Sequence, residues 1–189
     1  MAPRKQAKSQ TIYQLKITLK GARPPIWRRV QVTSDTTLGK LHQIIQETMG
    51  WFDYHLHSFL IQGEEYGQPM LGEDVEVHNE QSVKLSKVVT KEKLKFVYTY
   101  DFGDSWDHEI VVEKVLPLDP QVSYPVCLTG KRACPPEDCG GVWGYASFLE
   151  AIQDPSHSEH ESMLEWVGGK FDPDAFDLNG VNQLLKQIG

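Results

Sequence analysis

The chain has 189 residues, of which 40% are hydrophobic and 24% charged, and its formal net charge at pH 7 is −7. This length suffices for one structural domain with a substantial buried core. No apolar run approaches the length of a bilayer span, and the N-terminus lacks the apolar region of a signal peptide. We therefore expect a cytoplasmic protein with no membrane partner.

Positive charge is concentrated at the beginning of the chain. Residues 1–40 contain nine Lys or Arg and one acid, whereas residues 41–189 contain ten Lys or Arg and 25 acids. We expect residues 1–11 to form a disordered basic tail. A basic edge can bind nucleic acid even on an acidic protein, and Trp27, Arg28 and Arg29 together could stack on a base and bind phosphate. The alternative is that Trp27 is a half-buried residue of a sheet.

The first half of the chain predicts two strands and a helix. Polar and apolar residues alternate from Tyr13 to Leu19 and again from Ile26 to Val32, which predicts a hairpin. Apolar residues then recur at helical spacing from Leu38 to Met49, with Thr36 or Thr37 as the N-cap and Gly50 at the end.

Three more strands are expected before residue 117. "HSFLIQG" (57–63) predicts one strand, and the polar residues 63–82 predict a long irregular segment. Alternation over 94–100 and 106–112 predicts a second hairpin, whose turn "DFGDS" would place Gly103 at positive φ.

The composition changes after Pro117. Residues 117–144 are rich in Pro, Gly and Cys, and three helical patterns follow, the last capped by Asp177 or Asn179. We expect an α+β fold: a mixed, mostly antiparallel sheet with one crossing helix, β-grasp-like in its N-terminal part, and a helical C-terminal layer. Residues 12–116 would form the β-rich core, and 117–189 would pack on it within one structural domain.

The cysteines allow three interpretations. A Cys₃His zinc site would use Cys127, Cys134 and Cys139, with His157 or His160 as the fourth ligand. Alternatively, the thiols are packed in the core as small apolar groups. A redox or catalytic thiol would require a base next to it, and the sequence predicts none.

The histidines point to a second candidate metal site. His55 and His57 would lie on the same face if both belong to a strand, and His42 and His108 could approach them. Asp53, Asp101 and Asp104 could then supply oxygen ligands or a general base, as in a metal-dependent hydrolase or nuclease. In the alternative interpretation, these groups hydrogen-bond one another and cap turns without any metal.

Several enzyme classes are excluded by missing motifs. The Asp-Phe-Gly triplet at 101–103 occurs without the Gly-rich loop, strand Lys and H-R-D loop of a protein kinase. The chain also lacks the phosphate-binding loop, the dinucleotide fingerprint and the G-x-S-x-G elbow of a hydrolase.

Six segments together resemble the plasmid ORF-3-like family, which was named from an Ri-plasmid reading frame and is also described as a passenger protein of insertion elements. They are "LKGARPPIWRRVQV", "TLGKLHQIIQETMGWFDYHLHSF", "YTYDFGDSWDHEI", "ACPPEDCGGVWGY", "DPSHSEH" and "FDPDAFDLNGVN". The match runs from about Tyr13 to Asn182. The resemblance implies an α+β domain whose activity is not established. Some members carry a resolvase-like label, but this chain has no recombinase signature.

We therefore expect a binding or accessory module, linked to mobile elements, rather than an enzyme. Metal-dependent hydrolysis and a zinc-stapled interaction protein remain the alternatives, so zinc is the one cofactor considered. The candidate site would lie where the "HLH" strand, the second hairpin and the Cys-rich loop meet, at His42, His55, His57, Asp101, Asp104, Trp106, His108, Glu137 and Asp138.

Overall fold

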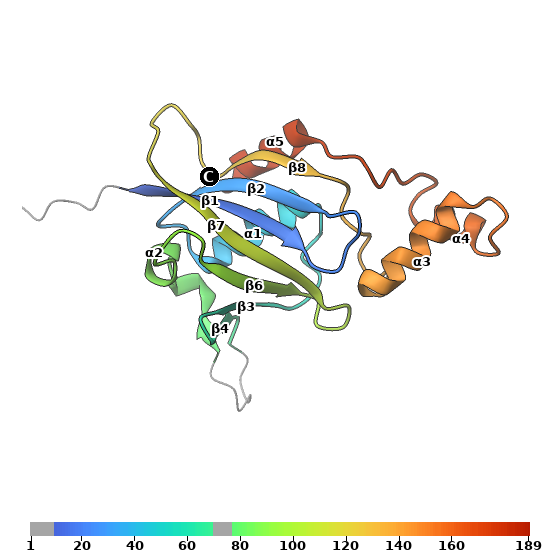
Figure 1. Ribbon diagram of the computed structural model, residues 1–189, viewed down its shortest axis with the longest axis horizontal. Helices are drawn as coiled ribbons and strands as arrows, with labels where there is room; N and C mark the ends of the chain where they lie inside the picture. The colour runs from blue at the N-terminus through green and yellow to red at the C-terminus, as the bar shows by residue number, and fades with distance from the viewer. Residues whose placement is uncertain (1–9, 70–76) are drawn as a thin grey trace, which may run out of the picture.

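The computed structural model describes residues 10–69 and 77–189 (Figure 1). The predicted basic tail falls mainly on residues 1–9, outside the described part. An eight-stranded sheet has the order β5-β4-β3-β6-β7-β1-β2-β8. Its strands are β1 (Thr11–Leu19), β2 (Trp27–Thr33), β3 (His57–Ile61), β4 (Glu64–Gly67), β5 (His78–Asn79), β6 (Lys95–Tyr100), β7 (Trp106–Pro117) and β8 (Val126–Lys131).

The predicted fold class is confirmed. All strand pairs of this sheet are antiparallel except β4 with β5, and both predicted hairpins, β1–β2 and β6–β7, are present. One helix, α1 (Leu38–Met49), crosses a face of the sheet (Figure 1). Its apolar side and the inward residues of the central strands form the core.

Local signals place α1 where the sequence predicts it. The Thr37 hydroxyl accepts a hydrogen bond from the backbone N–H of Lys40, which caps the first turn. Gly50 ends the helix at φ 94°, a left-handed conformation that glycine adopts without a steric penalty.

Two segments differ from their predictions. The Cys-rich region contains β8, which pairs with β2 at the edge of the sheet and was not expected there. The predicted irregular segment contains β4, β5 and the 3₁₀ helix η1 (Glu80–Ser82), and a short helix, α2 (Leu85–Val88), follows. Residues 70–76 of that segment lie outside the described residues.

The C-terminal helices are α3 (Gly141–Gln153), α4 (His160–Trp166) and α5 (Leu178–Ile188). α5 lies next to β8 and α1, whereas α3 and α4 pack together and project beyond one end of the sheet (Figure 1). The core contains Tyr145 and Phe148 of α3 and Leu185 of α5. Among the helices of the described residues, none is long and apolar enough to span a bilayer.

Candidate functional site

Three loops meet at one end of the sheet: residues 50–56 after α1, the β6–β7 turn, and the Cys-rich loop before α3. Tyr100 connects the first loop to the third, since its hydroxyl donates to Glu137 Oε1 (2.5 Å) and accepts from the backbone N–H of Tyr54 (3.0 Å). Asp104 connects the turn to the third loop by accepting a hydrogen bond from the Gly140 N–H (3.1 Å). The predicted meeting point of these segments is therefore present.

Asp101 closes the β6–β7 turn and also faces the site. Its Oδ1 accepts hydrogen bonds from the backbone N–H groups of Gly103 (2.9 Å) and Asp104 (3.4 Å). The left-handed residues of this turn are Asp101 (φ 56°) and Ser105 (φ 54°), so the prediction of positive φ at Gly103 is wrong. An Asx-type turn, in which the Asp side chain replaces a backbone acceptor, explains the difference.

His55 and His57 belong to two different clusters. His55 precedes β3 in an irregular segment, where its Nε2 lies 3.1 Å from Asp138 Oδ1 and its Nδ1 3.7 Å from Asp101 Oδ2. These contacts are ion-pair distances without the alignment of good hydrogen bonds. His57 is the first residue of β3 and lies against α1. The two histidines do not share a strand face, because the strand begins only at His57.

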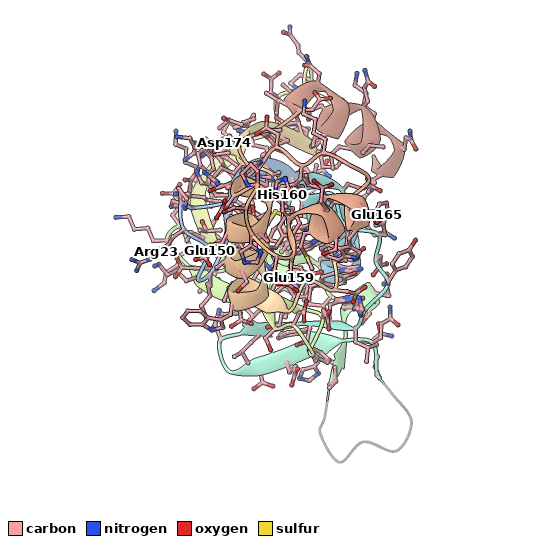
Figure 2. All side chains as sticks on the ribbon, turned by 90° about the vertical axis from the view of Figure 1, so that its right-hand side faces the viewer. Arg23, Glu150, Glu159, His160, Glu165 and Asp174 are labelled. Atoms are coloured by element: carbon pink, nitrogen blue, oxygen red, sulfur yellow. The ribbon has the colours of Figure 1, made fainter. Side chains whose placement is uncertain are left out.

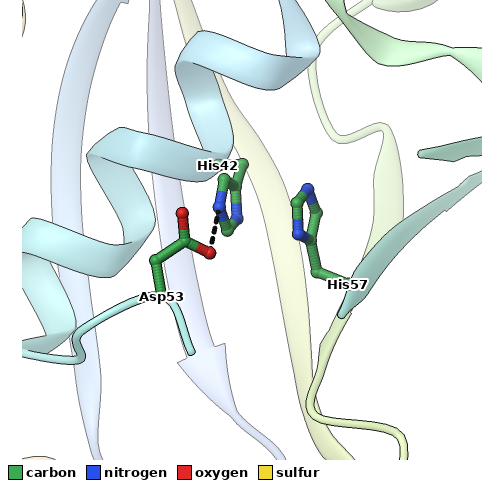
Figure 3. Close-up of side chains that lie close together, drawn as sticks. All are labelled: His42, Asp53 and His57. Carbon is green, nitrogen blue, oxygen red and sulfur yellow. Dashed lines mark hydrogen bonds and ion pairs between the residues drawn. The ribbon is translucent and has the colours of Figure 1, made fainter. Parts of the chain in front are cut away.

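The second cluster contains His42, Asp53 and His57 (Figure 3). The two imidazole rings stack with their centroids 3.4 Å apart and their planes 2° from parallel. Asp53 Oδ1 lies 2.9 Å from His42 Nε2. Burial lowers the pKa of His42 to about 3, so this ring is neutral at physiological pH.

Two other candidate residues, Trp106 and His108, are fully buried in the core. The His108 ring lies edge-on to Trp51 (5.3 Å between centroids) and 5.4 Å from the Tyr98 ring. Burial lowers the pKa of His108 to about 4. The hydrolase set predicted from the sequence is therefore divided, with His55 and Asp101 in one cluster, His57 in another and His108 in the core.

The structure does not assemble the predicted zinc ligands. Within the described residues, groups of three or more potential ligands occur only as His42–Asp53–His57 and His55–Asp101–Asp138. Cys127 is buried on β8, and burial raises the pKa of all three thiols, that of Cys139 to about 12. Protonated thiols are poor nucleophiles and poor metal ligands.

The two histidines of the predicted zinc site lie on the helical projection. His160 Nδ1 is 2.9 Å from the Ala151 carbonyl, and His157 Nδ1 accepts a hydrogen bond from the Glu159 N–H. His160 lies among Glu150, Glu159 and Glu165 in the view of this end of the molecule (Figure 2).

Arg28 is buried and cannot contact nucleic acid. The predicted nucleic-acid contact through Trp27, Arg28 and Arg29 is therefore corrected for Arg28. Only 1% of its surface is exposed, and its guanidinium donates to the carbonyls of Thr48 (2.6 Å) and Lys131 (3.0 Å). Its other face stacks over Phe176 (4.3 Å). Arg29 is ion-paired with Glu113 at 2.6 Å and lies over the Trp27 ring. The outward alternation of β2 predicts exposure for Arg29 but burial for Arg28.

Four exposed aromatic residues lie on the segments that meet at this end of the sheet and were not predicted as site residues. Phe52, Tyr54, Phe102 and Trp143 are 71%, 76%, 51% and 85% exposed. The Phe52 and Tyr54 rings stack on each other, and the Phe52 N–H contacts Glu137 Oε1. A sequence signal exists in "WFDYHLH" (51–57), which combines three aromatic residues with Asp53 and two histidines, but it does not reveal which rings face solvent.

We call these residues the acidic–aromatic face, defined as Phe52, Tyr54, His55, Asp101, Phe102, Asp104, Glu137, Asp138 and Trp143. The three segments that carry it, residues 50–57, 100–109 and 133–145, contain seven Asp or Glu and no Lys or Arg. Two of these acids, Asp107 and Glu109, are paired with Lys20 and Lys95 and lie outside the face. The acids of the face itself, Asp101, Asp104, Glu137 and Asp138, have no Lys or Arg within their own segments.

The mixed sheet crossed by one helix makes this chain an α+β protein, with the candidate site at one end of the sheet. The model of the family "Plasmid pRiA4b ORF-3-like protein" matches residues 11–180, and the chain belongs to that family. "Uncharacterized protein y4hQ" of Sinorhizobium fredii (strain NBRC 101917 / NGR234) is 35% identical over 180 residues, which are 94% of this chain and 92% of the relative.

A solved structure has the same fold. The "Crystal Structure of Protein of Unknown Function MM3350 from Methanosarcina mazei Go1" is 42% identical and superposes with a TM-score of 0.82. The similarity covers 90% of this chain and 97% of that one. The family and the fold of this chain are thus shown.

Proposed function

We propose that this protein is a non-catalytic, cytoplasmic binding module, and that the acidic–aromatic face binds a basic peptide segment of a partner protein. The main observation in support is that four exposed aromatic side chains lie on the segments 50–57, 100–109 and 133–145, which contain no Lys or Arg. An association with mobile elements remains a prediction that rests on the family's genetic context.

Exposed aromatic groups of this size are unusual unless a partner covers them. Water-exposed apolar patches in soluble proteins are often interaction sites, and Trp and Tyr dominate the binding energy of many interfaces. Trp143 is 85% exposed in the first turn of α3, where the glycines 140 and 141 fix the start of the helix. A flat ring held on a rigid element loses little conformational entropy on binding.

The charge of the face selects a cationic partner. Asp104, Glu137 and Asp138 supply carboxylates for pairing with a guanidinium, and Trp143 or Tyr54 offers a ring for cation–π contact. Arg and Lys side chains combine an apolar stem with a charged end, so they complement both components. Phosphate groups would be repelled by the same carboxylates, which argues against nucleic acid at this face.

The test measures the binding of fluorescein-labelled nonapeptides that alternate Arg with Ala, compared with peptides that carry Gln instead of Arg. We expect saturable binding of the Arg peptides, weakened about tenfold or more by Trp143→Ala or Tyr54→Ala, since each substitution removes a central aromatic contact. Anisotropy titrations at two salt concentrations give the affinities.

Two matched controls separate this face from general acidity. Trp166→Ala removes an exposed Trp (48%) of α4, and the triple variant Glu159→Gln, Glu161→Gln, Glu165→Gln removes three charges from the same projection. Both controls should bind like the unmodified protein. If the α4 charge variant lost as much affinity for the Arg peptides as Trp143→Ala does, binding would not depend on this face. That result would reject the proposal.

A further inference from the structure

Two histidines that lie 15 residues apart in the sequence (57 − 42 = 15) are stacked inside the protein next to a solvent-exposed carboxylate. His42 is on α1, His57 begins β3, and Asp53 lies in the loop between them (Figure 3). Each residue offers one ligand atom, and the three atoms lie within 4.8 Å of one another. We propose that His42, Asp53 and His57 bind one divalent transition-metal ion of the zinc class.

The hydrogen bonds around His42 leave Nε2 as its outward nitrogen. Gln46 Nε2 donates to the Tyr98 hydroxyl (2.9 Å), and that hydroxyl lies 2.8 Å from His42 Nδ1. Nδ1 is thereby engaged inside the core, whereas Nε2 faces the Asp53 carboxylate. An ion between Nε2 and Asp53 would retain Tyr98 as the hydrogen-bond partner of Nδ1–H.

His57 has the complementary arrangement. Its Nε2 lies 2.9 Å from Oε2 of Glu80, whose side chain is fully buried. With the Nε2–H donated to this carboxylate, Nδ1 carries the lone pair, and it has no hydrogen-bond partner within residues 10–69 and 77–189. A carboxylate behind a histidine is the usual outer-shell partner of a metal ligand, because it fixes the tautomer and raises the ligand's basicity.

The ligand atoms of the two rings are close enough for one ion after a small rearrangement. Two nitrogens bound to a tetrahedral Zn²⁺ at about 2.05 Å lie about 3.3 Å apart. The ligand atoms of His42, Asp53 and His57 lie within 4.8 Å of one another, so a small approach of the two nitrogens reaches that value. The lone pairs of stacked rings run parallel, so metal binding requires the rings to tilt toward each other.

The ligand set also limits the choice of ion. Two imidazoles and one carboxylate favour zinc and neighbouring first-row transition ions over Mg²⁺ and Ca²⁺, which prefer oxygen ligands. Half of the Asp53 side chain is exposed (52%), whereas those of His42 and His57 are buried, so an ion can enter from one side and keep water in its remaining positions.

The experiment uses chelator-treated full-length protein and titrates Zn²⁺ by calorimetry, with the visible absorption of Co²⁺ as a second measurement. We expect one ion per chain and a Co²⁺ spectrum of low coordination number. Asp53→Asn and His57→Gln should each weaken binding at least about 100-fold, since each removes a direct ligand. Glu80→Gln should weaken it about 10–100-fold through the outer shell.

Asp53→Asn is the decisive variant if His57→Gln fails to fold. Asp53 is exposed and has φ 59°, a conformation that Asn tolerates well, so this substitution changes the ligand and not the fold. His55→Ala and Cys134→Ser are the controls and should keep full zinc binding. The proposal is wrong if the unmodified protein binds no Zn²⁺ at about 100 μM. It is equally wrong if Asp53→Asn binds normally, or if Cys134→Ser removes the ion.

Discussion

Arg28 and Arg29 are neighbours on β2 with opposite surroundings. Arg28 is buried without a carboxylate, and its charge is balanced by the carbonyls of Trp27, Thr48 and Lys131 and by the Phe176 ring. Burial lowers its pKa from the ordinary value. Arg28 thus ties α1 and β8 to β2, a structural role that its sequence position beside Trp27 does not reveal.

Replacement of Arg28 should lower the free energy of unfolding strongly, and replacement of Arg29 should lower it little. Arg28→Met leaves buried carbonyls without donors, so we expect a loss of about 3 kcal/mol or more in the free energy of unfolding. Arg29→Met removes a partly exposed ion pair and should cost less than about 1 kcal/mol. Urea denaturation of the two variants measures the difference, and equal losses would contradict the role assigned to Arg28.

The buried histidines should make stability depend on pH. Burial lowers the folded-state pKa of His108 to about 4 and that of His42 to about 3, below the value of about 6.5 for an unfolded chain. The unfolded state therefore binds more protons below pH 6.5, so stability falls as the pH is lowered. Between pH 7.5 and 5, each histidine should remove about 2 kcal/mol.

His108→Leu should remove about half of the decrease in the free energy of unfolding between pH 7.5 and 5. The half that comes from His42 should remain. Neither ring nitrogen of His108 has a hydrogen-bond partner among the described residues, so the apolar replacement leaves no partner unpaired. Urea titrations in the presence of a chelator at several pH values give the slopes. The exposed His78→Gln serves as the control. If the free energy of unfolding of His108→Leu changed with pH as steeply as that of the unmodified protein, His108 would not be a source of the pH dependence.

At the scale of elements, α3 begins against the β6–β7 turn. A Cβ at Gly144 would lie 1.8 Å from the Cys139 carbonyl oxygen, and one at Gly141 would lie 2.6 Å from that of Asp104. Backbone atoms cannot move aside as a flexible side chain can. These close approaches hold Trp143 next to the turn and the Cys-rich loop.

Gly144→Ala should therefore displace α3 from the loop, even though Ala is the better helix former. We expect a loss of at least about 2 kcal/mol in the free energy of unfolding, together with weaker binding of the Arg peptides. Ser147→Ala, at an exposed position of the same helix, should be neutral or slightly stabilising. Normal stability of Gly144→Ala in urea would show that the contact is not tight.

Elements with local signals were predictable, and those that depend on distant partners were not. Thr37 and Gly50 specify the ends of α1 within a few residues of the chain. β8, by contrast, exists because β2 offers an edge to pair with, and its Pro- and Gly-rich flanks hide a strand of six residues. The separation of His55 from His57 depends on where β3 begins, which the alternation does not determine.

At the scale of the whole molecule, the sheet order brings the loops of the site together. β3, β6 and β7 are adjacent, so the loop before β3 and the β6–β7 turn lie at one end of the sheet. The Cys-rich loop reaches the same end because it connects the edge strand β8 to α3. Hence the convergence of these three segments agrees with the expectation from the sequence, and the site itself stays a prediction.

The makeup of the site was less predictable. Glu80, the buried partner of His57, lies in a polar segment that predicts only an irregular loop. The exposure of Tyr54 depends on the tertiary placement of its loop, and that of Trp143 on the placement of the first turn of α3. Residue types alone cannot distinguish a ring in the core from one on the surface.

The most direct test of the proposed function is an NMR titration of ¹⁵N-labelled protein with the alternating Arg–Ala peptide. The proposal predicts saturable shift changes of the backbone amides in residues 50–57, 101–105 and 137–143, with little change in β2 or β8. Changes confined to other surfaces, or the same changes with the Gln peptide, would contradict a cation-binding acidic–aromatic face.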